Sequence, residues 1–453
     1  MSLSNQRVVG GEELGAADSD TNFYAARLAG VNQDHVVLTT TDIVNANGVI
    51  LVRKGVRIDS NIAERILRHK LIKPLEEQVA VADGLNGQRL AERFACLHEK
   101  YPDLGHLHDR LGSIALCNEL SVKSEFHTML WQKLTVLEHE LPSEFEKGLF
   151  CAGLAALLAR ELKLSHQDIQ SAFLAGLTHD AGLLHIDPAI LNKNGPLTPP
   201  EWRAIQSHVI TGRMLLDHLP GVSSAAADAV MQHHERCDGT GYPVGTGEDQ
   251  LGLLGQVVAI ADSVQAIRVR QFEKLGRNLY DTLPYLNLNA YTHFYSVFQA
   301  MVSVLKRSGL SQTLVDAYGG VATMGLRLQQ RGESLQEAVG YLQAMVDSLE
   351  TSNIRSCGQH VLRSARRVQT MMVSSGLVRI ELTTWLGSLA QEPDESVLAE
   401  LNEIDLMQNE LRWQIRNLLR AFGEFYDLEC KDDSCGALAL HAERLEDCLK
   451  AAG

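Results

Sequence analysis

Long apolar runs, paired cysteines and an excess of positive charge are all missing from this chain of 453 residues. The longest apolar run, around residues 149–159, is too short to cross a bilayer. The N-terminus has no basic region followed by an apolar one, so we expect no signal peptide. The eight cysteines are scattered without paired zinc-binding spacing, which favours reduced thiols in a cytosol. These absences predict a cytoplasmic protein that does not enter a membrane.

The charge balance is acidic, with 56 Asp and Glu residues against 41 Lys and Arg residues, for a formal net charge of −15. This balance argues against general binding of nucleic acid. An anionic ligand would need local positive charge, which bound metal ions can supply. The hydrophobic content of 45% and the chain length predict a globular protein with two or three domains.

Histidines and aspartates recur between positions 179 and 262 on apolar segments. The candidate ligands are His179, Asp180, His208, His233, His234 and Asp262. Imidazoles and carboxylates without cysteine are the ligand set of a divalent metal such as iron, manganese, zinc or nickel. Burying such groups costs roughly several kcal/mol in lost hydration unless something pairs with them. A single metal centre would pair with all of them at once.

The first of these segments is predicted to be a helix that ends at the candidate ligands. An apolar stripe along residues 167–178 leads to His179 and Asp180, and Gly182 then breaks the helix. Neighbours on a helix point about 100° apart because a turn takes 3.6 residues. His179 and Asp180 can therefore share one metal only near a helix end, or they serve two metals.

The other candidate ligands also lie on predicted helices. Thr198-Pro199-Pro200-Glu201 is typical of a helix start, and His208 lies on the inward face of the helix that follows. Asp262 stands inside a nearly all-apolar helix over residues 251–267. The Gly-rich segment 236–247 is predicted to be a loop.

The order of these motifs resembles the HD-GYP family of metal-dependent phosphohydrolases, over roughly residues 145–310. The resemblance is carried by His179-Asp180-Ala181-Gly182, His233-His234-Glu235, Asp238-Gly239 and Gly241-Tyr242-Pro243, with His208 and Asp262 at the places of the middle His and the last Asp. It implies an all-helical domain that hydrolyses cyclic di-GMP at a centre of two or three metals. Iron or manganese is favoured, with zinc or nickel as alternatives. Asp180 would bridge two metals, and His179 and Asp180 are the predicted catalytic residues.

Four positions depart from the family pattern. Lys147 stands where the resemblance implies a His ligand, and a lysine offers a cation where a metal needs a lone pair. Leu183 replaces a lysine that helps to hold phosphate. Gln256 replaces an arginine, and Gln265 replaces an aspartate. The sequence therefore predicts a weakened enzyme.

The residues that would contact substrate are fewer than in the family pattern. The predicted set is Arg268, Arg270, Lys274 and Tyr242. Arg268 and Arg270 are substitutes, because Gln271 stands at the expected arginine position. Tyr242 also has a plainer interpretation, as a loop aromatic that packs on the fold.

Two other functions stay open at the level of the sequence. A degenerate domain could bind a cyclic dinucleotide, or a signalling partner through the Gly241-Tyr242-Pro243 loop, without turnover. A phosphohydrolase of another nucleotide is the third hypothesis, because ligand motifs do not name a substrate.

The regions on either side of residues 145–310 carry no chemical motif. We expect a mobile arm over residues 1–30. A strand hairpin built from 35–40 and 49–53, followed by helices, is predicted within residues 31–144. Residues 311–453 are predicted to be helical, and their apolar stripe along 398–425 fits either a bundle core or a homodimer interface. The whole chain is thus expected to be mostly α, with a central all-helical HD-type domain.

Overall fold

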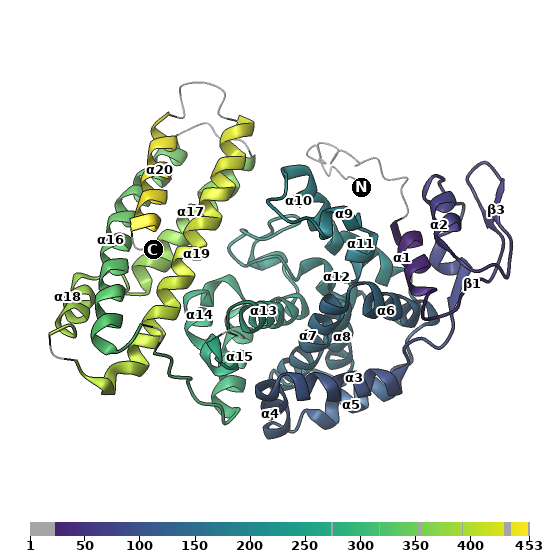
Figure 1. The fold of residues 1–453 in the computed structure, drawn as a ribbon, viewed down its shortest axis with the longest axis horizontal. Coiled ribbons are helices and arrows are strands. Elements are labelled where there is room, and N and C mark those ends of the chain that lie inside the picture. Colours follow the sequence, from purple (N-terminus) through teal and green to yellow (C-terminus); the bar gives the residue numbers. More distant parts are fainter. Residues whose placement is uncertain are drawn as a thin grey trace, which may run out of the picture. The chain divides into compact units, whose positions relative to one another are not determined.

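The computed structural model describes residues 23–272, 275–316, 318–351, 356–391, 393–429 and 436–451. These residues are mostly α-helical, which confirms the predicted fold class (Figure 1). The chain divides into two compact units, and the division does not follow the predicted domain boundaries, which stay predictions. No helix of the described part combines the length and the apolar character needed to cross a membrane.

The first unit comprises Met1–Asn86, Phe126–Phe145 and Ala181–Thr211. Its strands are β1 (Val37–Thr39), β2 (Ile43–Val44), β3 (Ile50–Val52) and β4 (Val79–Val81). Its helices are α1 (Phe23–Val31), α2 (Ser60–Leu67), η1 (Leu75–Gln78), α6 (Thr128–Glu140), η2 (Ala181–His185), α9 (Pro188–Leu191) and α10 (Pro199–Gln206). Helix α11 (His208–Asp217) begins in this unit.

The strands of the first unit pair differently from the sequence-based expectation. Strands β2 and β3 form the hairpin, with Ile43 opposite Val52, around a turn in which the Asn45 side chain accepts the backbone N–H of Val49 at 2.9 Å. Strand β1, expected in that hairpin, instead pairs antiparallel with β4, with Val37 opposite Val81. Strand β3 is already paired with β2, and β4, which follows α2 in the chain, pairs with β1. Such non-local pairing leaves no signal in a short sequence window.

The predicted mobile arm lies partly outside the described residues, which begin at position 23. Its last residues, 23–30, were expected to be mobile but belong to helix α1. Tyr24 and Leu28 of this helix are fully buried. The buried Arg27 Nε donates to the backbone oxygen of Leu184 at 3.0 Å. Apolar burial and this hydrogen bond explain why the segment is ordered.

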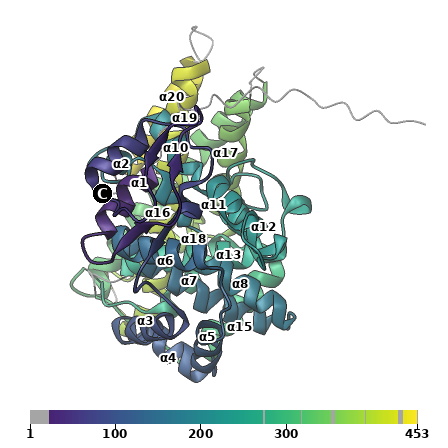
Figure 2. The ribbon, with the colours of Figure 1, turned by 90° about the vertical axis from the view of Figure 1, so that its right-hand side faces the viewer.

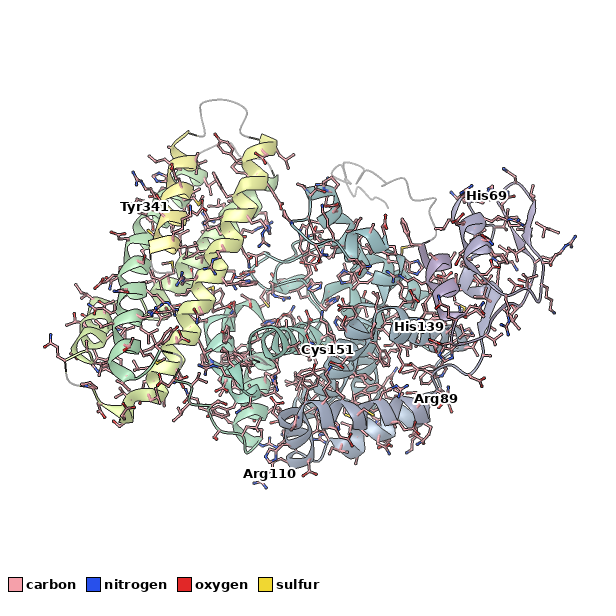
Figure 3. All side chains as sticks on the ribbon, in the orientation of Figure 1. His69, Arg89, Arg110, His139, Cys151 and Tyr341 are labelled. Atoms are coloured by element: carbon pink, nitrogen blue, oxygen red, sulfur yellow. The ribbon has the colours of Figure 1, made fainter. Side chains whose placement is uncertain are left out.

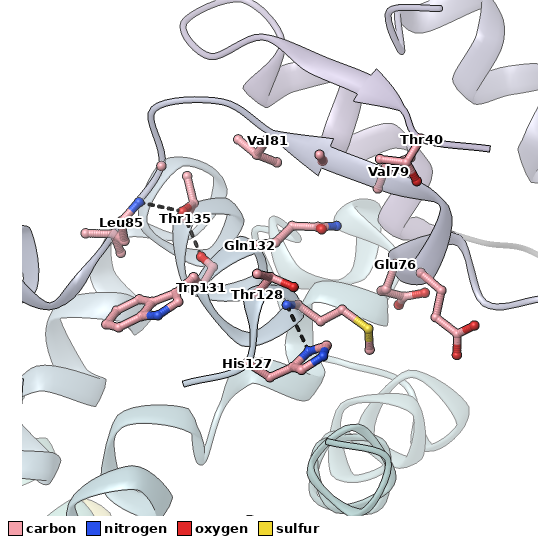
Figure 4. Close-up of a pocket in the computed structure, with 14 residues that line it drawn as sticks. Thr40, Glu76, Val79, Val81, Leu85, His127, Thr128, Trp131, Gln132 and Thr135 are labelled. Atoms are coloured by element: carbon pink, nitrogen blue, oxygen red, sulfur yellow. Dashed lines mark hydrogen bonds between the residues drawn. The ribbon is translucent and has the colours of Figure 1, made fainter. Parts of the chain in front are cut away.

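A cavity of about 500 Å³ lies in the first unit between β4 and α6 (Figure 4). Glu76, His127, Trp131 and Gln132 are among the side chains that line it. The backbone N–H of Leu85 donates to Thr135 at 2.8 Å beside it. The lining mixes apolar, acidic and neutral groups without a cluster of one kind.

The second unit comprises Gly87–Glu125, Glu146–Asp180 and Gly212–Gly453. Its first helices are α3 (Gly87–Lys100), α4 (Pro102–Arg110), α5 (Ile114–Val122), most of α7 (Pro142–Glu161), α8 (His166–Thr178), α12 (Ser224–Gln232), η3 (Glu248–Gln250) and α13 (Leu253–Ile267). Further helices are η4 (Arg268–Phe272), η6 (Leu279–Thr282), α14 (Leu283–Leu288), η7 (Ala290–Thr292) and α15 (Tyr295–Arg307). Helices α3 and α5 lie side by side in both views (Figures 1 and 2).

Helices α7 and α8 pack with their backbones almost in contact. A Cβ atom on Gly176 of α8 would lie 2.8 Å from the Cα atom of Ala152, and one on Gly148 of α7 would lie 2.6 Å from the backbone oxygen of Leu177. Both distances are shorter than real Cβ contacts allow, so glycine is required at each position. This close packing brings the first turns of α7 beside the residues that end α8.

The C-terminal part of the second unit is a bundle of α16 (Val321–Thr351), α17 (Ser356–Ser374), α18 (Ile380–Ser388), η8 (Glu395–Val397), α19 (Leu398–Glu429) and α20 (Gly436–Ala451). The apolar stripe predicted along 398–425 lies on α19. Leu411 and Ile415 of this stripe are fully buried in a core shared with α16, α17 and α20. The stripe therefore serves a bundle core, and the predicted homodimer stays a prediction.

Candidate metal centre

Most of the predicted ligands converge within the second unit, at the ends of α8 and α12 and inside α13. His179 and Asp180 follow the last residue of α8, and His233 caps α12. Asp262 lies on α13. The ligand atoms of Asp180, His233 and His234 all lie within 4.8 Å of one another, which is the spacing that one metal ion requires.

Backbone carbonyl groups orient two of the imidazole rings. The Nδ1 atom of His179 lies 2.8 Å from the oxygen of Gly176, and the Nδ1 atom of His233 lies 2.6 Å from the oxygen of Val230. A carbonyl oxygen can only accept, so Nδ1 carries the proton in each ring. The Nε2 atom of a neutral ring then presents its lone pair, which is the arrangement typical of metal-bound histidine.

Lys147 occupies the space between the two carboxylates. Its Nζ atom lies 2.8 Å from Asp180 Oδ2 and 2.8 Å from Asp262 Oδ1. Burial alone would lower the pKa of Lys147, but the two carboxylates together raise that pKa well above its ordinary value. Burial likewise opposes ionisation of Asp262, and Lys147 and His179 outweigh it, so the pKa of Asp262 falls to about 2. A fixed ammonium thus sits between the two carboxylates.

Cys151 lies beside this ammonium, and the sequence analysis did not single it out. The Sγ atom of Cys151 and ligand atoms of His179 and Asp262 lie within 4.8 Å of one another. Figure 3 shows Cys151 among the helices in the interior. Its position on α7, four residues after Lys147, is the signal that could have found it, because residues four apart share a helix face.

His208 and Leu183 belong to the first unit. The Nδ1 atom of His208 lies 2.7 Å from the oxygen of Ile205, and the side chain is buried. It has the same carbonyl-oriented arrangement as His179 and His233. Leu183 is also buried. The roles of both residues in the centre stay predictions.

The Gly-Tyr-Pro loop is held by a buried carboxylate. Glu235 accepts the backbone N–H groups of Val244 at 2.7 Å, Gly245 at 3.1 Å and Thr246 at 3.2 Å. A Cβ atom on Gly241 would lie 2.4 Å from the Cα atom of Glu235, so only glycine fits there.

Tyr242 lies against a predicted ligand rather than apart from the centre. Its ring stacks on that of His234 with 4.6 Å between the centroids and 27° between the planes. Burial and the nearby Asp180 and Asp262 carboxylates raise the pKa of Tyr242. The phenol therefore keeps its proton at neutral pH.

Of the predicted substrate-binding cations, only Arg268 has a side chain among the described residues, and the substrate role of all three stays a prediction. Arg268 forms a bidentate ion pair with Asp103, at 2.6 Å from Nε and 3.1 Å from Nη2, and lies over the ring of Tyr101. Lys274 and the side chain of Arg270 fall outside the described residues. In this structure the Arg268 guanidinium is engaged by Asp103.

Arg236 is the cation that the sequence analysis missed. Its Nη1 atom donates to the backbone oxygens of His233 at 3.0 Å and Glu235 at 2.8 Å. Its position within the motif from His233 to Pro243 is a signal that the sequence carried. Among the other departures, Gln256 is buried with its Nε2 atom lacking a hydrogen-bond partner, and Gln265 is half-buried.

Comparison with known proteins supports the same region. Residues 118–296 match the family model described as HD domain. A cyclic di-GMP phosphodiesterase from Pseudomonas aeruginosa is 33% identical over 60% of this chain and 62% of its own length. A 3'3'-cGAMP-specific phosphodiesterase from Vibrio cholerae is 31% identical over 38% of this chain and 39% of its own length.

A third relative is a cyclic di-GMP phosphodiesterase from Thermotoga maritima, 34% identical over 26% of this chain and 32% of its own length. The chain therefore spans less than two thirds of the length of each of these three relatives. The similarity to these relatives therefore concerns the HD domain rather than the whole length of each protein.

Proposed function

We propose that the protein is a metal-dependent phosphodiesterase of cyclic dinucleotides of the HD-GYP type, with cyclic di-GMP as the expected substrate, because residues 118–296 match the HD domain model and a cyclic di-GMP phosphodiesterase is among the relatives. The observation that carries the proposal is the convergence of Asp180, His233 and His234 within the reach of one ion. The names of the relatives support cyclic dinucleotides as the substrate class.

The ligand atoms fit one divalent metal ion. We propose that Asp180, His233 and His234 hold it, with His208 as the further ligand that the sequence motif predicts, and that iron or manganese is preferred over zinc or nickel. When bound, such an ion makes a nucleophile of water at neutral pH and polarises a phosphate oxygen. The protein's own part is to fix the imidazoles of His208 and His233 through backbone carbonyls and to bury them.

We propose that Lys147 disfavours a second metal ion beside Asp262, although ligand atoms of Cys151, His179 and Asp262 lie within 4.8 Å of one another there. The Lys147 ammonium already pairs with Asp180 and Asp262 there, at 2.8 Å from each. A cation of fixed position would repel a second ion and withholds a ligand atom. The ammonium of Lys147 therefore supplies the positive charge that a second metal ion would otherwise bring. We expect slow hydrolysis as the consequence.

Metal content and product release test the proposal together. Elemental analysis should show about one ion per chain after growth with added iron and manganese, and chromatography should show slow release of a linear product from cyclic di-GMP. His234→Ala should weaken metal affinity at least about tenfold, since one ligand is lost. His218→Ala is the control, because His218 is exposed. Metal-free wild-type protein without hydrolysis would contradict the proposal.

The double variant Lys147→His with Leu183→Lys tests the single-ion assignment. It restores a lone pair in place of the ammonium and adds a cation for phosphate. We expect metal content to rise from about one toward two ions per chain and hydrolysis to become faster. Two ions per chain in the wild type would show that Lys147 yields its place to metal.

The ion pairs of Lys147 also support a second candidate, a module that binds a cyclic dinucleotide or a signalling partner without turnover. Such a module would bind cyclic di-GMP but release no product even with metal bound. The partner contact through the Gly241-Tyr242-Pro243 loop belongs to this candidate. The product-release measurement separates the two.

A further inference from the structure

A cavity of about 300 Å³ lies within the second unit, beside the candidate ligand His234. One side consists of His234, Arg236, Thr240, Gly241 and Tyr242, from the motif region, and the other of side chains from α17 and α19. We call it the α17–α19 pocket. Its volume is at the small end for ligand sites, so it suits one nucleotide rather than a whole cyclic dinucleotide.

Arg367 on α17 supplies a largely buried guanidinium to this pocket, with 17% of its side chain exposed. Its Nη1 atom donates to Thr240 Oγ1 at 2.9 Å, and its Nη2 atom donates to Gln414 Oε1 at 2.9 Å. Its Nε atom is buried without a hydrogen-bond partner, and the Asp238 Oδ2 atom is 3.9 Å away. A buried N–H group of this kind costs free energy unless something accepts from it.

Arg236 brings a second guanidinium to the same pocket. The two guanidinium groups enter the pocket lining from opposite sides, Arg236 from the motif region and Arg367 from α17. Arg363 lies close by, with its Nη1 atom 3.6 Å from a Cβ placed on Gly239. Two converging arginines are an arrangement that binds phosphate oxygens well, because the guanidinium fork matches them.

Trp413 on α19 provides an aromatic face at the same pocket. It lines the cavity, yet its side chain is 48% exposed, which is unusual for a tryptophan in a helical bundle. Gln414 and Asn417, which also line the pocket, carry amide groups that can both donate and accept. An exposed indole beside cations and amides is the combination on which nucleic-acid bases stack.

We propose that the α17–α19 pocket is a nucleotide-binding subsite, in which Arg367 and Arg236 bind a phosphate and Trp413 stacks on a purine base. The inference rests on the proposed function, since it assigns the part of the dinucleotide that lies beyond the metal ion. The C-terminal bundle then contributes substrate contacts.

Binding of cyclic di-GMP and GMP to the full chain tests the subsite, by calorimetry and by quenching of tryptophan fluorescence. Arg367→Gln should weaken both nucleotides at least about tenfold, as expected for loss of a charged hydrogen-bond donor. Trp413→Leu should weaken them about fivefold or more, as expected for loss of a stacked base. Arg366→Gln is the matched control, because the neighbouring Arg366 is exposed and pairs with Glu350. It should bind within about twofold of the wild type.

Metal content and unfolding temperature are measured on the same samples. If Arg367→Gln does not fold, the exposed Trp413→Leu decides alone. Equal binding by the wild type and Trp413→Leu, or no binding of either nucleotide by the wild type, overturns the subsite whatever the metal content. Nucleotide binding that depends on Arg367 and Trp413 in a protein without metal or hydrolysis supports the subsite and contradicts the proposed function.

Discussion

Two largely buried lysines, one in each unit, differ in the number of their carboxylate partners and in the direction in which their pKa shifts. Lys133 in the first unit pairs with one carboxylate, Glu76, at 2.5 Å. Burial outweighs this partner and lowers the pKa of Lys133 to about 8. Lys147 in the second unit pairs with two carboxylates, and they outweigh burial, so its pKa rises.

The comparison indicates why Lys147 has two carboxylate partners, whereas Lys133 has one. One carboxylate suffices for a structural ion pair, as at Lys133 and Glu76. The pair Asp180 and Asp262 holds more negative charge than one buried lysine needs. The same carboxylates also face the His179 ring, whose Nε2 atom lies 3.1 Å from Asp180 Oδ2, and they raise its pKa although burial and Lys147 lower it. Surplus buried carboxylate is the mark of a site built for a cation.

Removing Lys147 should have the largest effect. Lys147→Met leaves Asp180 and Asp262 buried without their cation, so we expect the metal-free protein to lose about 3–5 kcal/mol of unfolding free energy. Added manganese should restore most of the loss, because the ion replaces the ammonium. Urea unfolding with and without manganese measures both effects. A loss that manganese does not repair would show that Lys147 serves only packing.

The ion pair of Glu76 with Lys133 should make the unfolding free energy of the first unit depend on pH. Burial raises the pKa of Glu76, but Lys133 and His185 lower it to about 2, from an ordinary value of 4.5. A carboxyl with a depressed pKa stabilises the fold fully above its unfolded pKa. This stabilisation, on the order of 3 kcal/mol, should disappear as pH falls from about 4.5 to 2.

Unfolding free energies between pH 6 and pH 2 measure this contribution. Glu76→Gln should remove this part of the slope in that window, whereas Glu64→Gln, on the exposed face of α2, should keep it. Identical slopes in Glu76→Gln and the wild type would contradict a depressed pKa.

The motif residues could be predicted from the sequence, but the residues that surround them in the fold could not. His179, Asp180, His233 and His234 were predicted as a group, because a motif in one order along the chain is a local signal. The ion pairs of Lys147 depend on how closely α7 and α8 pack through Gly148 and Gly176, which no residue pattern reports.

Non-local contacts explain the other differences. Strand β1 pairs with β4 about forty residues later, so a hairpin with the nearer strand was the reasonable but wrong expectation. The ion pair of Arg268 with Asp103, far away in sequence, is another contact that its position near the last Asp did not indicate. The α17–α19 pocket joins α17 and α19 to the motif loop. Its residues could not be connected to the site before the fold was known.

The smallest change in unfolding free energy is expected when both partners of the Lys133–Glu76 ion pair are replaced. Lys133→Met with Glu76→Leu replaces a buried ion pair by apolar side chains, and such exchanges are often neutral or stabilising. We expect a change within about 1 kcal/mol at pH 7, because no charge is left unpaired. The corresponding triple variant Lys147→Met, Asp180→Asn and Asp262→Asn should instead abolish metal binding. Urea unfolding and elemental analysis of both variants measure the contrast. If the double variant loses as much stability as Lys147→Met does, Lys133 also sits in a site that needs its cation, and the two lysines do not differ in kind.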